Sequence, residues 1–314
     1  MGKGTVMLIE SKRTILDSIG NTSLIALRNI LPVNGSRILL KMEGENPTGS
    51  MKDRVARAII ETAESDGRLR TGASVVDYSS GNTGISLAMV CAVKSHPLYI
   101  VSSDAFAKEQ LAHMKYLGAK LQIVPSQNGQ VTAQLYHDMI EASRIIARKT
   151  NSFWADQMKN RDQLVAYREL AHEIWEQSYG EIDGFVQCVG TAASLRGIGE
   201  ALRLYRGKIE IAAVEPSESA VISGGVSGSH QIDGIGVGYI VPLWQDLLAD
   251  RVEQVSTAEA VAMTSRLARE EGIFAGASTG CNVVAALRLA ERLGPGSTVV
   301  TIMCDTGMRY LSKH

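Results

Sequence analysis

A single lysine, Lys52, stands where a predicted strand gives way to a predicted helix, and it is the first candidate for chemistry. The apolar run over 38–43 predicts a strand, and Val55, Ala58 and Ile59 recur at helical spacing after it. The start of a helix carries the positive end of its dipole, which disfavours an ammonium ion. A partly desolvated, neutral amine is what forms an imine with a carbonyl-bearing cofactor. The spacing therefore predicts Lys52 as a covalent anchor, with a solvated surface lysine as the alternative.

A second cluster of small and polar residues, Ser-Ser-Gly-Asn-Thr-Gly over 79–84, follows a predicted strand at 74–78 and opens a predicted helix at 84–94. Hydroxyls, a carboxamide and backbone N–H groups thus converge on one helix start, an arrangement that binds anions. The expected ligand is a carboxylate or a phosphate, and Asn82 could also hydrogen-bond a ring hydroxyl next to the imine. Simple helix capping is the alternative for this composition.

A third junction of the same kind follows the apolar run 184–189. The loop that comes next consists of Gly190, Thr191, Ala192, Ala193 and Ser194, and a helix is predicted over 195–205. Such a loop can cradle a phosphate. The chain has no Walker sequence, and its Gly-x-Gly-x-Gly run at 234–238 follows a His/Gln/Asp loop instead of a strand, so the signatures of nucleotide-binding folds are weak.

In order and spacing, these three loops resemble those of the cysteine synthase and cystathionine β-synthase family, the fold type II enzymes that depend on pyridoxal phosphate. The resemblance runs from the motif at 16–22 to the motif at 305–311. It implies an α/β fold of two domains, each a largely parallel twisted sheet covered by helices, as in the β subunit of tryptophan synthase. Residues 45–150 would form a smaller mobile domain, and residues 1–44 and 151–314 the larger, cofactor-binding domain.

The same resemblance implies roles for individual residues. Lys52 would hold pyridoxal phosphate as an internal aldimine and serve as the acid–base catalyst, and Ser278 would face the pyridine nitrogen. The cofactor phosphate would be bound by Gly190, Thr191, Ala192, Ala193 and Ser194. The substrate carboxylate would be held by Ser79, Ser80, Gly81, Asn82 and Thr83, with Asn82 also meeting the ring hydroxyl. Gln157 and Gly234 match further substrate-binding segments.

Ser278 also indicates the type of reaction. A neutral hydroxyl leaves the pyridine nitrogen less protonated than an acidic partner would, so the ring is a weaker electron sink. A weak sink suits the immediate expulsion of a β-substituent. We therefore expect β-replacement on an activated serine, O-acetylserine or O-phosphoserine, through an aminoacrylate intermediate, with sulfide as the acceptor and cysteine as the product.

Three alternatives stay open at this point. An amine could replace sulfide and give a diamino acid, or water could enter and make the chain a β-eliminating lyase or dehydratase. A cofactor-free binding protein descended from the same fold is a third possibility, and the joint presence of Lys52, Asn82 and Ser278 argues against it.

Two departures from the family pattern concern the predicted phosphate loop. Ala192 and Ala193 stand where the family usually has a glycine pair, and a Cβ penalises positive φ, so we expect a differently shaped loop. Arg196 stands where a small hydroxyl residue is common; we expect it to point to solvent, with a contact to the phosphate as the alternative. The segments 105–110 and 168–173 also lack the patterns usual in cysteine synthases, which leaves the substrate open.

The composition is that of an ordinary globular enzyme. The 314 residues are 45% hydrophobic and 21% charged, enough for two domains with substantial cores. A net charge of −1 with mixed signs argues against nucleic acid or an anionic membrane as a partner, and favours a small amino-acid substrate and its nucleophile. The N-terminus has no apolar stretch of secretory length, so we expect a cytoplasmic protein.

Cysteine and histidine spacings indicate no metal site. Cys91, Cys188, Cys281 and Cys304 form no C-x-x-C pair and lie in apolar or small-residue surroundings, which predicts buried, reduced thiols. The predicted helix at 281–293 has alanine and leucine on more than one face, which suggests burial in a subunit interface. A homodimer is the expectation from the family resemblance.

Alternating strands and helices predict parallel α/β sheets. Strands are expected near 38–43, 74–78, 98–102, 121–124, 184–189, 209–214 and 297–303. Helices are expected near 51–65, 84–94, 107–117, 130–149, 161–178, 195–205, 257–271 and 281–293. The Gly-, Ser- and Pro-rich stretch 215–242 is too long for an idle connection, and we expect it to border the site.

Overall fold

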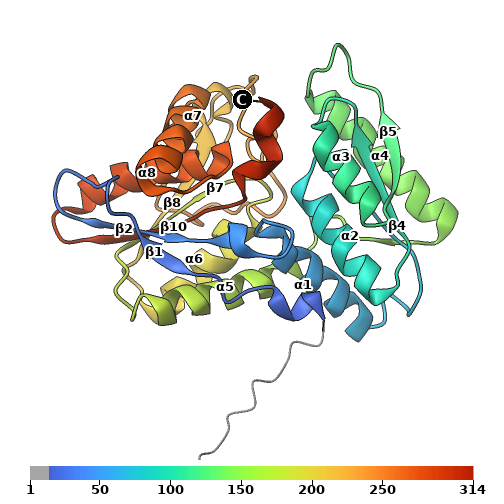
Figure 1. Ribbon diagram of the computed structural model, residues 1–314, viewed down its shortest axis with the longest axis horizontal. Helices are drawn as coiled ribbons and strands as arrows, with labels where there is room; N and C mark the ends of the chain where they lie inside the picture. The colour runs from blue at the N-terminus through green and yellow to red at the C-terminus, as the bar shows by residue number, and fades with distance from the viewer. Residues whose placement is uncertain (1–13, 314) are drawn as a thin grey trace, which may run out of the picture.

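Two sheets organise the chain in the computed structural model, which describes residues 14–313 (Figure 1). The larger sheet has six strands in the order β1-β2-β10-β7-β8-β9, and β1 is its antiparallel edge strand. Its strands are β1 (Leu24–Ala26), β2 (Arg37–Lys41), β7 (Gly184–Cys188), β8 (Glu210–Pro216), β9 (Arg251–Val255) and β10 (Thr298–Ile302). Residues 1–13, which belong to the range predicted for the larger domain and to the N-terminus in which no secretory signal was predicted, lie outside the described residues.

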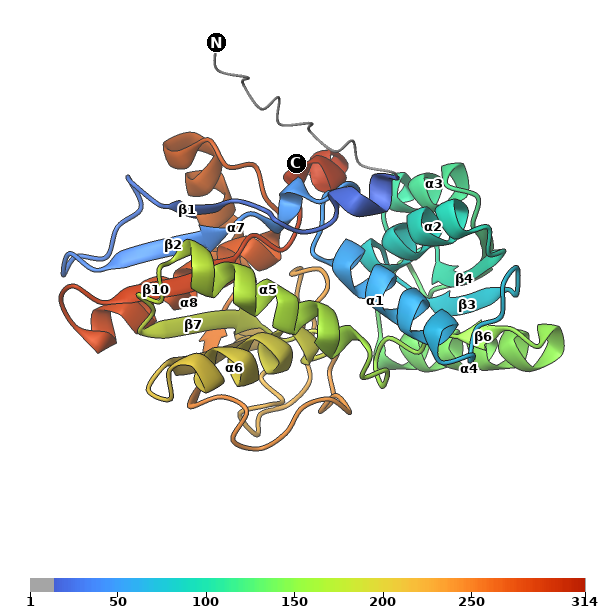
Figure 2. The ribbon, with the colours of Figure 1, turned by 90° about the horizontal axis from the view of Figure 1, so that it is seen from below.

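The smaller sheet is wholly parallel, with the order β5-β4-β3-β6. Its strands are β3 (Val75–Tyr78), β4 (Leu98–Ser103), β5 (Lys120–Val124) and β6 (Phe153–Trp154). Its helices are α2 (Asn82–Lys94), α3 (Lys108–Tyr116) and α4 (Ala133–Thr150). Figure 2 shows α2 and α3 on one face of this sheet and α4 on the other.

Helix pairs cover both faces of the larger sheet. The pairs are α5 (Gln163–Gln177) with α6 (Ala193–Tyr205), and α7 (Thr257–Arg266) with α8 (Ala277–Leu293). Figure 1 shows the first pair below the sheet and the second above it. Helix α1 (Lys52–Ser65) packs on both α2 and α5, so it lies at the boundary between the two sheets (Figure 2). Short helical turns complete the chain: η1 (Ile15–Ser18), η2 (Glu43–Glu45), η3 (Ser217–Ser219), η4 (Leu267–Glu271) and η5 (Gly307–Lys313).

Coverage on both faces explains why the central strands are apolar without alternation. Every residue of β7 and β10 is buried, because a parallel strand between two helical layers has no solvent face. The same holds for β3, including its one acidic residue, Asp77. The sequence prediction of an α/β fold with largely parallel sheets is confirmed.

The predicted elements all appear, and three further strands were missed. Strands β1 and β6 have three and two residues, too short for a periodic signal. Strand β9, Arg-Val-Glu-Gln-Val, is too polar to form an apolar run. The helix predicted at 257–271 ends at Arg266 and continues as the π-helical turn η4.

Helix α8 is buried on several faces within the chain. It packs on α7, β7 and β10, and Val283, Ala286, Leu289 and Ala290 are fully buried there. These contacts account for its apolar residues, and the subunit interface suggested by them in the sequence stays a prediction. The four cysteines are free and buried, as predicted. Within residues 14–313, no helix has the length and apolar character needed to cross a bilayer.

Candidate active site

The carboxyl ends of strands from both sheets open onto one cavity, the usual place for a ligand in parallel α/β folds. Lys52 follows β2, the polar loop at 79–83 follows β3, and the loop at 190–194 follows β7. The predicted site residues that line this cavity are Lys52, Ser79, Ser80, Gly81, Asn82, Thr83, Gln157, Gly190, Thr191, Ser194, Gly234 and Ser278. Ala192 and Ala193 are buried and do not line it.

Four helix N-termini meet at this cavity. Lys52 and Asn82 are the first residues of α1 and α2, and Ser194 and Ser278 are the second residues of α6 and α8. The first N–H groups of a helix have no partner within it and carry the positive end of the dipole. The cavity is therefore suited to a ligand with more than one anionic group.

The ionisation of Lys52 differs from the sequence argument. Burial acts to lower its pKa, but Tyr167, Cys304, Cys188 and Asp305 act to raise it and prevail, so the pKa lies above its usual value. The neutral amine predicted from the helix dipole alone is wrong for the cofactor-free chain, in which Lys52 is an ammonium ion. The amine must lose a proton before it can form an imine.

The polar loop after β3 is held by its own side chains. The Ser79 hydroxyl accepts hydrogen bonds from the backbone N–H groups of Gly81 and Gly84, at 3.1 and 2.9 Å, and so caps the start of α2. The Thr83 hydroxyl donates to Gln157 Oε1 at 2.7 Å, and Gln157 Nε2 donates to the Tyr78 carbonyl at 2.7 Å. Gln157 thus joins the segment after β6 to this loop and fixes the shape of the cavity wall.

Asn82 is held by the C-terminal segment of the chain. Its Nδ2 donates to Asp305 Oδ2 at 2.7 Å, and its Oδ1 accepts from Arg309. Tyr310 donates its hydroxyl to the same Asp305 oxygen at 2.6 Å. Burial raises the pKa of Asp305, while Tyr310, Asn82 and Arg309 act to lower it. The motif at 305–311 therefore positions Asn82, a role that the sequence analysis did not assign to it.

The loop after β7 contains a left-handed alanine. Ala192 has φ of 68° and is the N-cap of α6, so the loop takes the turn that a glycine would adopt more easily. The expectation that the alanine pair gives the loop a different shape from that of the family stays a prediction. Arg196 was predicted wrongly: it is buried, 7% exposed, and its Nε donates to Glu200 Oε1 at 2.9 Å.

Several residues that line the cavity were missed as site residues. Tyr136 comes from α4, Asp233 from the long stretch 215–242, and Cys188 and Cys304 from the ends of β7 and β10. Asp233 lines both this cavity and an adjoining one, which confirms the expectation that 215–242 borders the site. In the sequence, the only indication for Asp233 was its position within this long stretch.

The donor groups present fit pyridoxal phosphate. Lys52 offers an amine for the aldehyde, and the hydroxyls of Thr191 and Ser194 stand with the N-terminus of α6 for the phosphate. A Cβ at Gly190 would clash with the Gly234 carbonyl oxygen, so the cradle closes tightly around a glycine. Within residues 14–313, no group of three or more His, Cys, Asp or Glu side chains is arranged to hold a metal ion.

Comparison with known proteins identifies the family. The family described as "Pyridoxal-phosphate dependent enzyme" matches residues 15–305. The chain belongs to this family. It is 36% identical over 300 residues to a cysteine synthase of Staphylococcus aureus, and the match covers 95% of each chain. The predicted family and cofactor are therefore confirmed.

Two solved structures show the same fold. A cysteine synthase from Entamoeba histolytica has a TM-score of 0.92 and 34% identity, covering 99% of this chain and 93% of that one. An O-ureido-L-serine synthase has a TM-score of 0.88 and 33% identity, covering 96% of this chain and 94% of that one. The chain is thus an enzyme of the cysteine synthase type in family and fold.

Proposed function

We propose that the chain catalyses β-replacement on an activated serine, O-acetylserine or O-phosphoserine, with sulfide as the acceptor and cysteine as the product. The observation that carries this proposal is the single cavity in which Lys52, the loop at 79–83 and the hydroxyl of Ser278 lie at converging helix N-termini. The similarity to proteins named cysteine synthase supports it.

Each group has a defined task in this reaction. Pyridoxal phosphate, when bound, supplies an electron sink for the charge that develops at the substrate α-carbon. Thr191 and Ser194 would hold its phosphate, and the neutral hydroxyl of Ser278 would face its ring nitrogen without supplying a proton. The backbone and side chains of 79–83 bind the substrate carboxylate at the N-terminus of α2.

Lys52 then moves the proton. Once released as a free amine, its Nζ accepts the proton from the substrate α-carbon and later returns one to the product. The carboxylate site is kept rigid by the hydrogen bonds from the Gly81 N–H to Ser79, from Thr83 to Gln157 and from Gln157 to the Tyr78 carbonyl. The substrate α-carbon therefore stays within reach of Lys52.

One observation favours a second candidate acceptor. The carboxylate of Asp233 lies on the wall shared by the cavity and its neighbour. A carboxylate there attracts a cationic amine and can accept a proton from it as it attacks. Asp233 therefore favours, as the alternative, an amine acceptor and a diamino acid as the product. If neither sulfide nor an amine is used, the outcome is β-elimination to pyruvate and ammonia.

The test is product analysis with defined donors. Purified protein is loaded with pyridoxal phosphate and incubated with O-acetylserine or O-phosphoserine, with and without sulfide, and products are identified by mass spectrometry. We expect cysteine with one donor and its loss in Lys52→Ala and in the matched Lys52→Arg, which keeps the charge but not the amine. Pyruvate without any cysteine would refute β-replacement with sulfide, and a new amino acid formed with an added diamine would select the amine alternative.

We also propose a cytoplasmic homodimer in which residues 45–150 move as a smaller domain over the cavity. The family resemblance supports the homodimer and the moving domain, and the lack of an apolar stretch of secretory length at the N-terminus supports the cytoplasmic location. Closure would exclude water from a reactive intermediate. Sedimentation equilibrium gives the oligomeric state, and small-angle scattering with and without donor tests the movement. A monomeric mass, or identical scattering in both states, would contradict the corresponding statement.

A further inference from the structure

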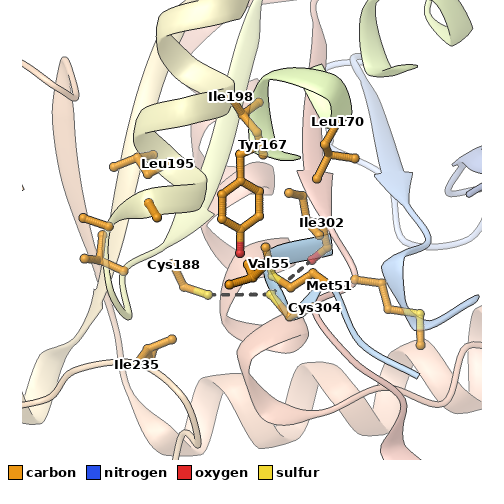
Figure 3. Packing of buried hydrophobic residues seen from close by; sticks show 14 of the residues in the cluster. Met51, Val55, Tyr167, Leu170, Cys188, Leu195, Ile198, Ile235, Ile302 and Cys304 are labelled. Carbon is orange, nitrogen blue, oxygen red and sulfur yellow. Dashed lines mark hydrogen bonds between the residues drawn. The ribbon is translucent and has the colours of Figure 1, made fainter. Parts of the chain in front are cut away.

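Two cysteines stand side by side on the wall of the cofactor cavity. The sulfur atoms of Cys188 and Cys304 are 3.8 Å apart, and both residues line the same cavity as Lys52 (Figure 3). Cys188 is the last residue of β7, and Cys304 comes two residues after the end of β10. The proposed reaction uses neither thiol, so the pair needs its own explanation.

The thiols follow two neighbouring parallel strands. Strands β7 and β10 pair through Gly184 with Val299 and through Phe185 with Val300, and Cys188 and Cys304 stand at the same, carboxyl end of these strands. A disulfide needs its sulfur atoms at about 2.05 Å, so the contact of 3.8 Å must shorten by about 1.8 Å.

The surroundings leave the sulfur atoms weakly held. Cys304 Sγ accepts a hydrogen bond from Asn282 Nδ2 at 3.4 Å and a long one from Gln187 Nε2 at 3.8 Å. Figure 3 shows the hydroxyl end of Tyr167 directed toward the pair and Met51 beside it. No group lies between these two sulfur atoms, because they are already in van der Waals contact.

The two thiols differ in acidity in the way that disulfide formation requires. The hydrogen bond from Cys188 lowers the pKa of Cys304 against the effect of burial, and Lys52 adds to the lowering. The same contact raises the pKa of Cys188. Cys304 is thus the more acidic thiol of the pair and the one that attacks when deprotonated, and Cys188 is the partner that resolves the product.

The other two cysteines provide an internal contrast. Cys91 and Cys281 are buried and do not line the cavity. Burial raises the pKa of Cys91 to about 12, and it raises the pKa of Cys281 as well. Neither has the combination of a neighbouring thiol, a neighbouring ammonium group and contact with the cavity.

We propose that Cys188 and Cys304 form a redox site on the wall of the cofactor cavity, which a small peroxide entering that cavity converts reversibly to a disulfide. The Cys304 thiolate attacks one oxygen of hydrogen peroxide, the O–O bond breaks, and hydroxide leaves, giving a sulfenic acid. The Cys188 sulfur then attacks the Cys304 sulfur, an S–S bond forms, and the sulfenic oxygen leaves as water with the thiol proton. In sum, two thiols and one peroxide give one disulfide and two waters, and a dithiol reverses the change.

This site would link oxidation to the state of the cofactor cavity. A ligand that fills the cavity shields the sulfur atoms, so the cofactor-free chain is the sensitive form. The disulfide also removes the ionisable thiol of Cys304, which acts to raise the pKa of Lys52. The oxidised chain therefore has a Lys52 of lower pKa than the reduced chain.

The test is peptide mapping of the native full-length chain. Protein freed of cofactor and protein loaded with it are treated with a few equivalents of hydrogen peroxide, alkylated without reduction, digested and examined by mass spectrometry. We expect a linked Cys188–Cys304 peptide about 2 Da lighter than the two free thiols together, lost again after dithiothreitol, and formed at least tenfold more slowly in the loaded protein.

Matched variants make the result specific. Cys91→Ser combined with Cys281→Ser should form the linked peptide as fast as the wild type. Cys188→Ser should stop at a Cys304 sulfenic acid that a dimedone reagent captures, and Cys188→Ala serves the same purpose if the serine variant does not fold. A linked peptide that forms only in denaturant would overturn the proposal, and equal rates with and without cofactor would overturn entry through the cavity. None of these readouts depends on the enzymatic reaction.

Discussion

Replacing Asp77 by asparagine is expected to stabilise this protein in a strongly pH-dependent way. Asp77 lies in β3, directly before the loop at 79–83, and it is fully buried. Neither carboxylate oxygen has a hydrogen-bond partner of normal geometry. Burial is the largest cause of a pKa raised to about 8, with the charge of Asp156 adding to it and nearby N–H groups opposing it.

The sign and size of this effect follow from the difference between folded and unfolded chains. An aspartate carboxyl in an unfolded chain has a pKa of 3.8 and Asp77 in the folded chain has one of about 8, so between these two pH values the folded state binds more protons. Stability therefore falls as the pH rises through this window, by up to about 1.4 kcal/mol per pH unit, and no further above it. Asparagine has no such titration. The stability gained by the variant over the wild type should grow by about 4 kcal/mol between pH 5 and pH 8.

Urea unfolding of wild type and Asp77→Asn at pH 5, 6, 7 and 8 measures this difference directly. The matched control is Asp66→Asn, an exposed carboxyl whose pKa Arg68 holds below its usual value, and its difference from wild type should not change over the same range. A constant difference for Asp77→Asn, or one that shrinks with rising pH, would refute the claim that this carboxyl stays protonated at neutral pH.

Three further substitutions test the cavity and its support. Glu173→Gln removes the acidic partner of Arg54, whose Nη1 lies 2.6 Å from the carboxylate, and should lower the free energy of unfolding at pH 7 by about 3 kcal/mol in urea unfolding. This loss should disappear as the pH falls from about 4.5 toward 2, because the wild-type carboxylate itself becomes protonated there, and an equal loss at pH 3 would contradict the prediction. Ala192→Gly relieves a φ of 68° and should raise stability by about 0.5 kcal/mol or more, whereas a loss would show that the alanine is not strained. Gly190→Ala should weaken binding of pyridoxal phosphate at least tenfold in a fluorescence titration while the chain stays folded by circular dichroism, and unchanged affinity would mean that the loop moves freely.

The parts of the fold that sequence could predict are those with a strong local signal. The short segments of β7 and β10, rich in apolar and β-branched residues, favour buried strands, and the helices between strands follow from their 3.6-residue period. Strand β9 was not predicted because most of its residues are polar, and its extended conformation depends on pairing with β8. Strand β6 has two residues that pair with β3, a contact that no pattern within 153–154 contains.

The site divides in the same way. Lys52, the loop at 79–83 and the loop at 190–194 lie at strand–helix junctions, where residue type and position are visible in a few consecutive letters. Tyr136 and Asp233 reach the same cavity from a helix and a long connection, so their placement depends on how the two sheets meet. The burial of Arg196 had no local signal: Glu200 stands four residues later on the same helix and pairs with it, a spacing that predicts an ion pair and not burial.

Lys52 shows why the ionisation of a residue is harder to predict than its place. The sequence argument used one field, the dipole of α1, which disfavours the ammonium ion. The folded chain brings Tyr167 from α5, Cys188 from β7 and Cys304 and Asp305 from beyond β10 to the same amine, and together they favour it. These groups lie more than a hundred residues from Lys52 in the sequence, so no local segment contains both the effects that lower its pKa and those that raise it. The effect is mutual, because Cys304 raises the pKa of Lys52 and Lys52 lowers the pKa of Cys304. The ionisation of the residue that anchors the cofactor is therefore coupled to that of the proposed redox thiol.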